Sequence, residues 1–102
     1  MKYMETGWYE SASPEERDLF HDWLHGILAD QNLSYVSVTF KKKDGTERVM
    51  KCTLREDIAT RYEKKTERKS NPDTCFVFDT EKQEWRSFRY DSIRVVAFEF
   101  GL

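Results

Sequence analysis

The pattern of apolar and polar positions changes its period once along the chain, near Tyr35. Between residues 19 and 28, large apolar side chains recur as adjacent pairs every four residues, which predicts an amphipathic helix. The segment Ser13–Glu16, SPEE, marks its start with a serine cap, a proline at the first helical position and a glutamate that completes a capping box. We therefore expect a helix from about Pro14 to Asp30.

From Tyr35 onward, apolar side chains alternate with polar ones, which is the period of a strand. The first alternating run covers residues 35–41. Asp44-Gly45 behind it predicts a tight hairpin turn, because this pair readily adopts positive φ. The remaining strands are expected at Arg48–Leu54, Cys75–Asp79, Glu84–Tyr90 and Ile93–Phe100.

These elements predict one domain of class α+β that is mostly β. Residues 1–33 form an N-terminal arm and the amphipathic helix, and residues 34–102 form a small barrel of five short, strongly bent antiparallel strands. A polar segment, Arg55–Thr74, interrupts the barrel and is expected to hold a short helix at about Ile58–Lys65. The expected core is Leu19, Trp23, Ile27, Val38, Phe40, Met50, Cys52, Leu54, Phe76, Phe78, Phe88, Val95 and Ala97.

Charge divides the chain into an acidic front and a basic middle. Over all 102 residues, 19 acidic and 17 basic side chains give a net charge of −2. Residues 1–40 contain seven acidic and two basic residues, whereas residues 41–70 contain eleven basic and six acidic ones. Such asymmetry indicates either a surface that meets a charged partner or two regions that face each other.

Composition also limits where in the cell the protein is expected and which cofactors it is expected to bind. No apolar run reaches the roughly 18 residues of a membrane span, and the N-terminus has no apolar leader segment, so we expect a cytoplasmic protein without membrane association. Cys52 and Cys75 are expected to be buried free thiols, because a reducing cytosol disfavours a disulfide. Without a Cys-x-x-Cys pair we expect no structural zinc, and nothing indicates another cofactor.

Two barrel segments together form a known pattern. The first, FKKKDGTERVMKCTL (Phe40–Leu54), contains a Lys-Asp-Gly-Thr hairpin followed by Met and Thr-Leu. The second, NPDTCFVFDTEKQEWRSFRYDSI (Asn71–Ile93), contains a strand ending in Asp and a Trp-Arg-Ser-Phe-Arg strand that leads into Asp-Ser-Ile. In this order they resemble a family of small phage and bacterial proteins described as Sm-like SH3 barrels, a second WYL-type family. The resemblance covers roughly residues 36–96. It implies an SH3-like fold and a phage or mobile-element origin, but no particular ligand.

The strand EWRSFRY carries the first candidate binding residues. Alternation places Trp85 and Arg89 on one face of it. A base stacked on Trp85 and a phosphate held by Arg89 would make a platform for single-stranded RNA or DNA. In the alternative interpretation, Trp85 covers one end of the barrel and Arg89 pairs with Asp79 or Asp91.

The basic middle of the chain, residues 41–69, supplies the second set of candidates. Basic side chains before the hairpin turn and in the polar segment are suited to phosphate contacts. Interleaved acids such as Glu63 and Glu67 would instead give a self-neutralised, solvated surface. The candidate residues are Lys41, Lys42, Lys43, Arg61, Lys64, Lys65 and Arg68.

His21 and His25 lie four residues apart on the predicted helix, a spacing found in zinc proteases. The residue after the first histidine is Asp22, which is too short to act as the general base there, and no third ligand is evident. We therefore expect an exposed histidine pair on the solvated side of the helix and no metal site. Nucleophile motifs and glycine-rich phosphate loops are absent from the sequence, so we expect no catalytic residues and no enzymatic activity.

Two classes of function remain. The preferred hypothesis is a non-catalytic binding module of phage origin, which acts on a host or phage protein through the acidic N-terminal segment or a barrel edge. The alternative is a single-stranded nucleic-acid-binding barrel that uses residues 41–69 together with Trp85 and Arg89. The excess of acidic over basic residues favours the protein partner. Self-association stays open.

Overall fold

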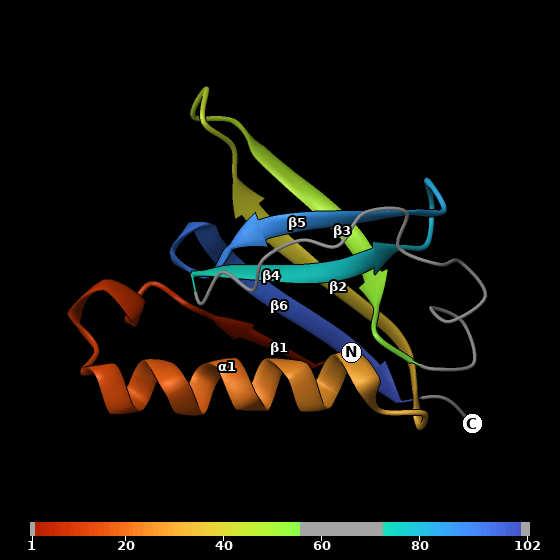
Figure 1. The fold of residues 1–102 in the computed structure, drawn as a ribbon, viewed down its shortest axis with the longest axis horizontal. Coiled ribbons are helices and arrows are strands. Elements are labelled where there is room, and N and C mark those ends of the chain that lie inside the picture. The colour runs from red at the N-terminus through yellow and green to blue at the C-terminus, as the bar shows by residue number, and fades with distance from the viewer. Residues whose placement is uncertain (1, 56–72, 101–102) are drawn as a thin grey trace.

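The computed structural model describes residues 2–55 and 73–100, and it consists of one long helix packed on a bent antiparallel sheet (Figure 1). Its elements are β1 (Lys2–Glu5), the 3-10 turn η1 (Tyr9–Ser11), α1 (Pro14–Ala29), β2 (Leu33–Lys41), β3 (Glu47–Thr53), β4 (Thr74–Asp79), β5 (Glu84–Arg89), the 3-10 turn η2 (Tyr90–Ser92) and β6 (Ile93–Phe100). The sheet order is β1-β6-β2-β3-β4-β5. The expected fold class is confirmed, although the sheet formed by the described residues is open.

Strand β1 is a sixth strand that the sequence pattern did not predict. It lies antiparallel beside β6. Directly after it comes Thr6, which is 2% exposed. The hydroxyl of Thr6 donates to the carbonyl of Ile93 at 2.6 Å, and its N–H donates to the carbonyl of Arg94 at 3.0 Å. The N-terminal arm is therefore part of the sheet.

Helix α1 begins as predicted. The hydroxyl of Ser13 accepts the N–H of Glu16 at 3.2 Å, and the carboxylate of Glu16 accepts the N–H of Ser13 at 3.0 Å, so both halves of the capping box are present. The helix ends at Ala29, where the N–H of Asp30 bonds the carbonyl of Ile27 at 3.2 Å. Local sequence thus determines the start of the helix.

The buried face of α1 is narrower than expected. The residues it buries are Phe20, Leu24 and Leu28, with Trp23 and Ile27 partly buried. The prediction that Leu19 belongs to the core is wrong, because its side chain is 69% exposed. Each residue turns the helix by about 100°, so Leu19 lies about 140° from Leu24 and faces solvent.

The hairpin between β2 and β3 is confirmed. Gly45 has φ of 91°, which favours glycine, and the N–H of Lys42 donates to the carbonyl of Thr46 at 2.7 Å. The carboxylate of Asp44 accepts both the N–H and the hydroxyl of Thr46, at 3.0 and 2.6 Å. These hydrogen bonds lower the pKa of Asp44. The Lys-Asp-Gly-Thr motif therefore builds the turn.

A register shift in the β2–β6 pairing, between Thr39 and Phe40, determines which side chains of β6 face inward. Ile93 and Val96 are both buried although they are three residues apart, a spacing that a regular strand cannot place on one face. The prediction that Val95 and Ala97 belong to the core is therefore wrong, and both side chains are only half-buried.

The core lies between α1, the inner face of the sheet and the β4–β5 hairpin, which crosses β2 and β6 in Figure 1. Cys52 and Cys75 are buried free thiols, as expected. Burial raises the pKa of Cys75 to about 11. The other expected core residues that are confirmed as buried are Val38, Met50, Phe78 and Phe88, while Phe40 and Leu54 are partly buried against the core. The prediction for Phe76 is wrong, because this side chain is half-buried and is not among those packed on the core. The expected helix at Ile58–Lys65 falls outside the described residues.

Candidate binding surfaces

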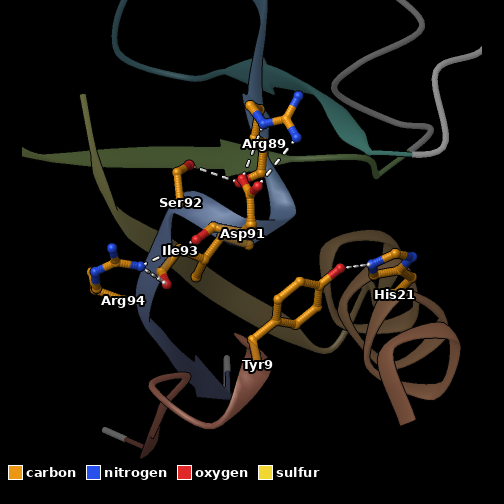
Figure 2. Close-up of polar contacts among 7 residues, drawn as sticks. All are labelled: Tyr9, His21, Arg89, Asp91, Ser92, Ile93 and Arg94. Atoms are coloured by element: carbon orange, nitrogen blue, oxygen red, sulfur yellow. Dashed lines mark hydrogen bonds and ion pairs between the residues drawn. The ribbon is translucent and has the colours of Figure 1, made fainter. Parts of the chain in front are cut away.

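The two members of the expected nucleic-acid platform on β5 both contact other residues of the chain. Trp85 is half-buried and packs edge-on against Phe78, with ring centroids 5.8 Å apart. The guanidinium of Arg89 donates from Nε and Nη2 to the two carboxylate oxygens of Asp91, at 3.0 and 3.1 Å (Figure 2). Hydrogen bonding to this carboxylate raises the pKa of Arg89. Of the two partners considered for Arg89, Asp91 is the one observed.

The corner between β5 and β6, turn η2, is held by the same group of residues (Figure 2). The hydroxyl of Ser92 donates to the carbonyl of Arg89 at 2.7 Å. Nη1 of Arg94 donates to the carbonyls of Asp91 and Ile93, at 3.2 and 3.1 Å. The Asp-Ser-Ile part of the sequence pattern therefore stabilises a chain reversal, which explains these residues without a ligand.

The basic candidates are only partly placed by the structure. Lys41, Lys42 and Lys43 are exposed at the β2–β3 hairpin. The remaining candidates, Arg61, Lys64, Lys65 and Arg68, lie outside the described residues. The structure therefore brings three lysines together on one hairpin, and it does not test whether the second basic group lies near them.

The histidine pair matches the predicted exposed pair only in part, because His25 is exposed whereas His21 is half-buried. The hydroxyl of Tyr9 and Nε2 of His21 share a hydrogen bond of 2.6 Å (Figure 2), and Nε2 of His25 shares one of 2.7 Å with the hydroxyl of Tyr90. His21 is half-buried, and burial lowers its pKa. The helix pattern alone does not reveal this cluster, because both tyrosines come from other segments, η1 and η2.

The outward surface of α1 is acidic and carries one large exposed apolar side chain. Leu19 has Glu15 and Glu16 one turn before it and Asp22 one turn after it, and all are exposed. We call Glu15, Glu16, Asp18, Leu19 and Asp22 the acidic helix surface. The sequence pattern did not predict this surface, because Leu19 lies next to the apolar stripe along the chain. The angle of about 140° between Leu19 and Leu24 around the helix axis is the signal that could have placed Leu19 outside the buried face.

The only basic residue of α1 does not neutralise this surface, because it faces the N-terminal arm. Nε of Arg17 donates to the carbonyl of Tyr9 at 3.0 Å, and Nη2 donates to the carbonyl of Glu10 at 2.8 Å. The guanidinium also lies 4.9 Å from the ring centroid of Tyr9. The outward face of the helix therefore presents carboxylates around a leucine.

Two other kinds of feature are missing from the described ranges, 2–55 and 73–100. No group of three or more His, Cys, Asp or Glu side chains that could hold a metal ion occurs there. Within the same residues, no helix is long and apolar enough to cross a membrane.

A short, strongly bent antiparallel sheet with an N-terminal helix, a tight β2–β3 hairpin and a 3-10 turn before the last strand defines an Sm-like member of the SH3-type barrels. The family model WYL_2, Sm-like SH3 beta-barrel fold, matches residues 27–94, and the chain belongs to this family. The matched region leaves out β1, most of α1 and most of β6. Comparison with curated proteins and with solved structures gives no match.

Proposed function

We propose that this protein is a non-catalytic binding module whose acidic helix surface docks on a protein partner. The observation that carries the proposal is the 69% exposure of Leu19 between Glu15, Glu16 and Asp22. An apolar anchor surrounded by charged groups is the arrangement of an interface centre with a polar rim. The partner it fits is a protein with an apolar pocket bordered by Lys or Arg side chains.

The contacts of β5 support a protein partner over nucleic acid. A base-stacking platform needs an accessible ring and a guanidinium free to meet phosphate. Trp85 packs on Phe78, and Arg89 is bidentate to Asp91. Acidic residues also outnumber basic ones in the chain. The family resemblance to small phage and bacterial proteins supports a phage origin and action in the cytoplasm of a bacterial host.

Site-specific photocrosslinking in bacterial cells tests the proposal. A photoreactive residue at position 19 should form an adduct with one protein, and the same residue at position 49 is the matched control, because Val49 is 59% exposed on β3. The adduct at position 19 should disappear when Glu15 and Asp22 are both changed to Lys. Equal adducts at the two positions would contradict a specific helix interface.

The identified protein is then purified and titrated with the complete chain. We expect its affinity to fall with rising salt, because the interface pairs opposite charges. We expect Leu19→Asp to weaken binding about tenfold or more, as for a central apolar anchor. Val49→Asp should leave the affinity unchanged. Binding that is insensitive to both salt and Leu19→Asp would rule out the acidic helix surface.

The second candidate function, binding of single-stranded RNA or DNA, is supported by the three exposed lysines on the β2–β3 hairpin. Its test is charge reversal of Lys64, Lys65 and Arg68 to Glu. If nucleic acid is the ligand, binding collapses, and every phosphate group that is no longer bound lowers the slope of log K against log salt by about 0.7. A protein partner held by the acidic helix surface is hardly affected. Salt-sensitive binding of single strands that this change abolishes would displace the protein-partner proposal.

A further inference from the structure

Three strands bring a buried carboxylate and two arginines together on the inner side of the bent sheet. Nη2 of Arg48, from β3, lies 3.6 Å from Oδ2 of Asp79 at the end of β4. Nη1 of Arg86, from β5, lies 3.9 Å from the same oxygen. The side chain of Asp79 is 3% exposed, whereas those of the two arginines are 30% and 31% exposed. The arginines therefore lie between the core and solvent.

The other oxygen of Asp79 has a separate structural role. Oδ1 accepts the N–H groups of Glu81 and Lys82, both at 3.0 Å, and so fixes the turn between β4 and β5. Only Oδ2 is left for two guanidiniums. A buried carboxylate needs a compensating charge, and one arginine would supply it. Neutralising the charge of Asp79 therefore accounts for one of the two arginines but not for the other.

The hydrogen-bonding capacity of the two guanidiniums also exceeds what Asp79 offers. Each guanidinium has five N–H donors, and hydrogen bonds to oxygen usually measure about 2.7–3.2 Å between heavy atoms. Both distances to Oδ2 are longer than this. Nη1 of Arg86 is buried and has no hydrogen-bond partner among the described residues. Among the described residues, Arg86 has a second ion-pair partner in Glu84, whose Oε1 lies 3.4 Å from Nε and whose side chain is 55% exposed.

Aromatic rings line the same side of the sheet. Phe40 pairs with Arg48 across β2 and β3, and Phe88 follows Arg86 by two residues on the same face of β5. The rings of Phe40 and Phe88 stack with centroids 5.5 Å apart. Such apolar neighbours lower the local dielectric constant and strengthen any ion pair formed beside them.

We propose that Arg48 and Arg86 form a binding site for an oxyanion, a carboxylate or a phosphate group, which supplies the acceptors that Asp79 alone does not. Guanidiniums match both groups because their N–H donors lie in a planar fork. The site does not involve α1, so it is independent of the proposed protein interface. Parallel titrations with one anion of each kind decide which of the two the site prefers.

The experiment follows the arginine side-chain Nε–H signals of the ¹⁵N-labelled chain by NMR. Separate titrations use sodium phosphate, sodium acetate and, as the control, sodium chloride at matched ionic strength. We expect the signals of Arg48 and Arg86 to shift and saturate with phosphate or acetate but not with chloride. The internal references are Arg89, which is paired with Asp91, and Arg94, which bonds backbone carbonyls. If neither phosphate nor acetate gives a saturable shift beyond that of chloride, the proposal is wrong.

Asp79→Asn separates a binding site from a purely internal ion network. The amide keeps an oxygen for the two N–H groups of the turn but removes the charge that competes with the ligand. Because that charge lies within 4 Å of both guanidiniums, we expect the oxyanion to bind about tenfold more tightly. Unchanged or weaker binding by the folded variant would overturn the proposal.

Two further variants and a control keep the test decisive if Asp79→Asn does not fold. Glu84→Gln removes the half-exposed carboxylate beside Arg86 and should also tighten oxyanion binding. Arg86→Gln should abolish the saturable shift of the Arg48 signal, whereas Arg94→Gln, which removes a charge elsewhere, should leave it in place. A shift of Arg48 that persists unchanged in Arg86→Gln would contradict a shared site.

Discussion

His21 lies flat against the ring of Tyr90, with ring centroids 3.7 Å apart and 19° between the ring planes. Tyr9 bonds the same histidine from the N-terminal arm, and His25 bonds the hydroxyl of Tyr90. The cluster thereby joins three segments: the arm, α1 and the corner before β6. Its packing makes the neutral form of His21 the favoured one.

The protonation of His21 should therefore couple to stability. Burial lowers its pKa from the ordinary value of 6.5 and His25 lowers it further, while Asp18, Asp22 and Asp73 oppose the shift. A histidine with a lowered pKa in the folded chain stabilises the fold above its ordinary pKa, and this contribution is lost as the pH falls below it. We expect a smaller free energy of unfolding in urea at pH 5 than at pH 7.

The matched control for this prediction is His21→Phe, which keeps a ring against Tyr90 but cannot titrate. Its free energy of unfolding should vary less between pH 5 and pH 7 than that of the unaltered chain. The carboxylates, present in both proteins, account for whatever dependence remains. Equal pH dependence in the two proteins would exclude His21 as the source.

Phe88 should be among the most costly side chains to truncate. It is 4% exposed and stacks on Phe40 inside the bent sheet. We expect Phe88→Ala to lower the free energy of unfolding by about 3–5 kcal/mol, as for other buried phenylalanines. Val49→Ala, on the exposed side of β3, should change it by less than about 0.5 kcal/mol. A loss below about 1 kcal/mol for Phe88→Ala would place this side chain outside the core.

Truncating Leu24 should lower the free energy of unfolding much more than truncating Leu19. Leu24 is 0% exposed, and Leu24→Ala should cost about 2–5 kcal/mol. Leu19 is 69% exposed, and Leu19→Ala should change stability by less than about 0.5 kcal/mol. Urea unfolding monitored by circular dichroism measures both. Similar losses for the two variants would mean that the helix is rotated about its axis and buries a different face.

Thr6 should contribute more to stability than a residue so near the N-terminus usually does. Thr6→Val keeps the shape of the side chain but leaves the buried carbonyl of Ile93 without the hydroxyl that now donates to it at 2.6 Å. Because Nη1 of Arg94 still donates to this carbonyl at 3.1 Å, we expect a loss of about 0.5–1.5 kcal/mol. The control is Ser11→Ala, which removes an exposed hydroxyl and should have little effect. A neutral result for Thr6→Val would indicate that β1 contributes little to the folded state.

Local signals in the sequence were sufficient for several elements. Ser13 and Glu16 determine the start of α1, and Asp44 with Gly45 determines the β2–β3 turn, because each depends on interactions within a few residues. The inward face of β6 was not predictable in the same way. Both of its faces carry apolar residues, and the register shift that brings Ile93 inward depends on pairing with β2.

The candidate sites illustrate the same limit. That Arg89 bonds Asp91 could be weighed from the sequence, because the two residues are neighbours along the chain. The grouping of Arg48, Asp79 and Arg86 could not, since it requires three strands to lie side by side. The contacts of His21 with Tyr9 and Tyr90 could not be predicted either, because the two tyrosines lie 81 positions apart in the sequence.

The position of β6 between β1 and β2 has a consequence for synthesis on the ribosome. Strands β1 and β2 emerge first, yet neither borders the other, and β6, which separates them, is the last of the described strands along the chain. The hydrogen bond from Thr6 to Ile93 spans 87 positions of sequence. Until β6 leaves the exit tunnel, both early strands lack the neighbour that completes their hydrogen bonding, and such distant pairing is slow to form. The nascent chain therefore has to keep two unpaired strand edges apart until β6 has been made.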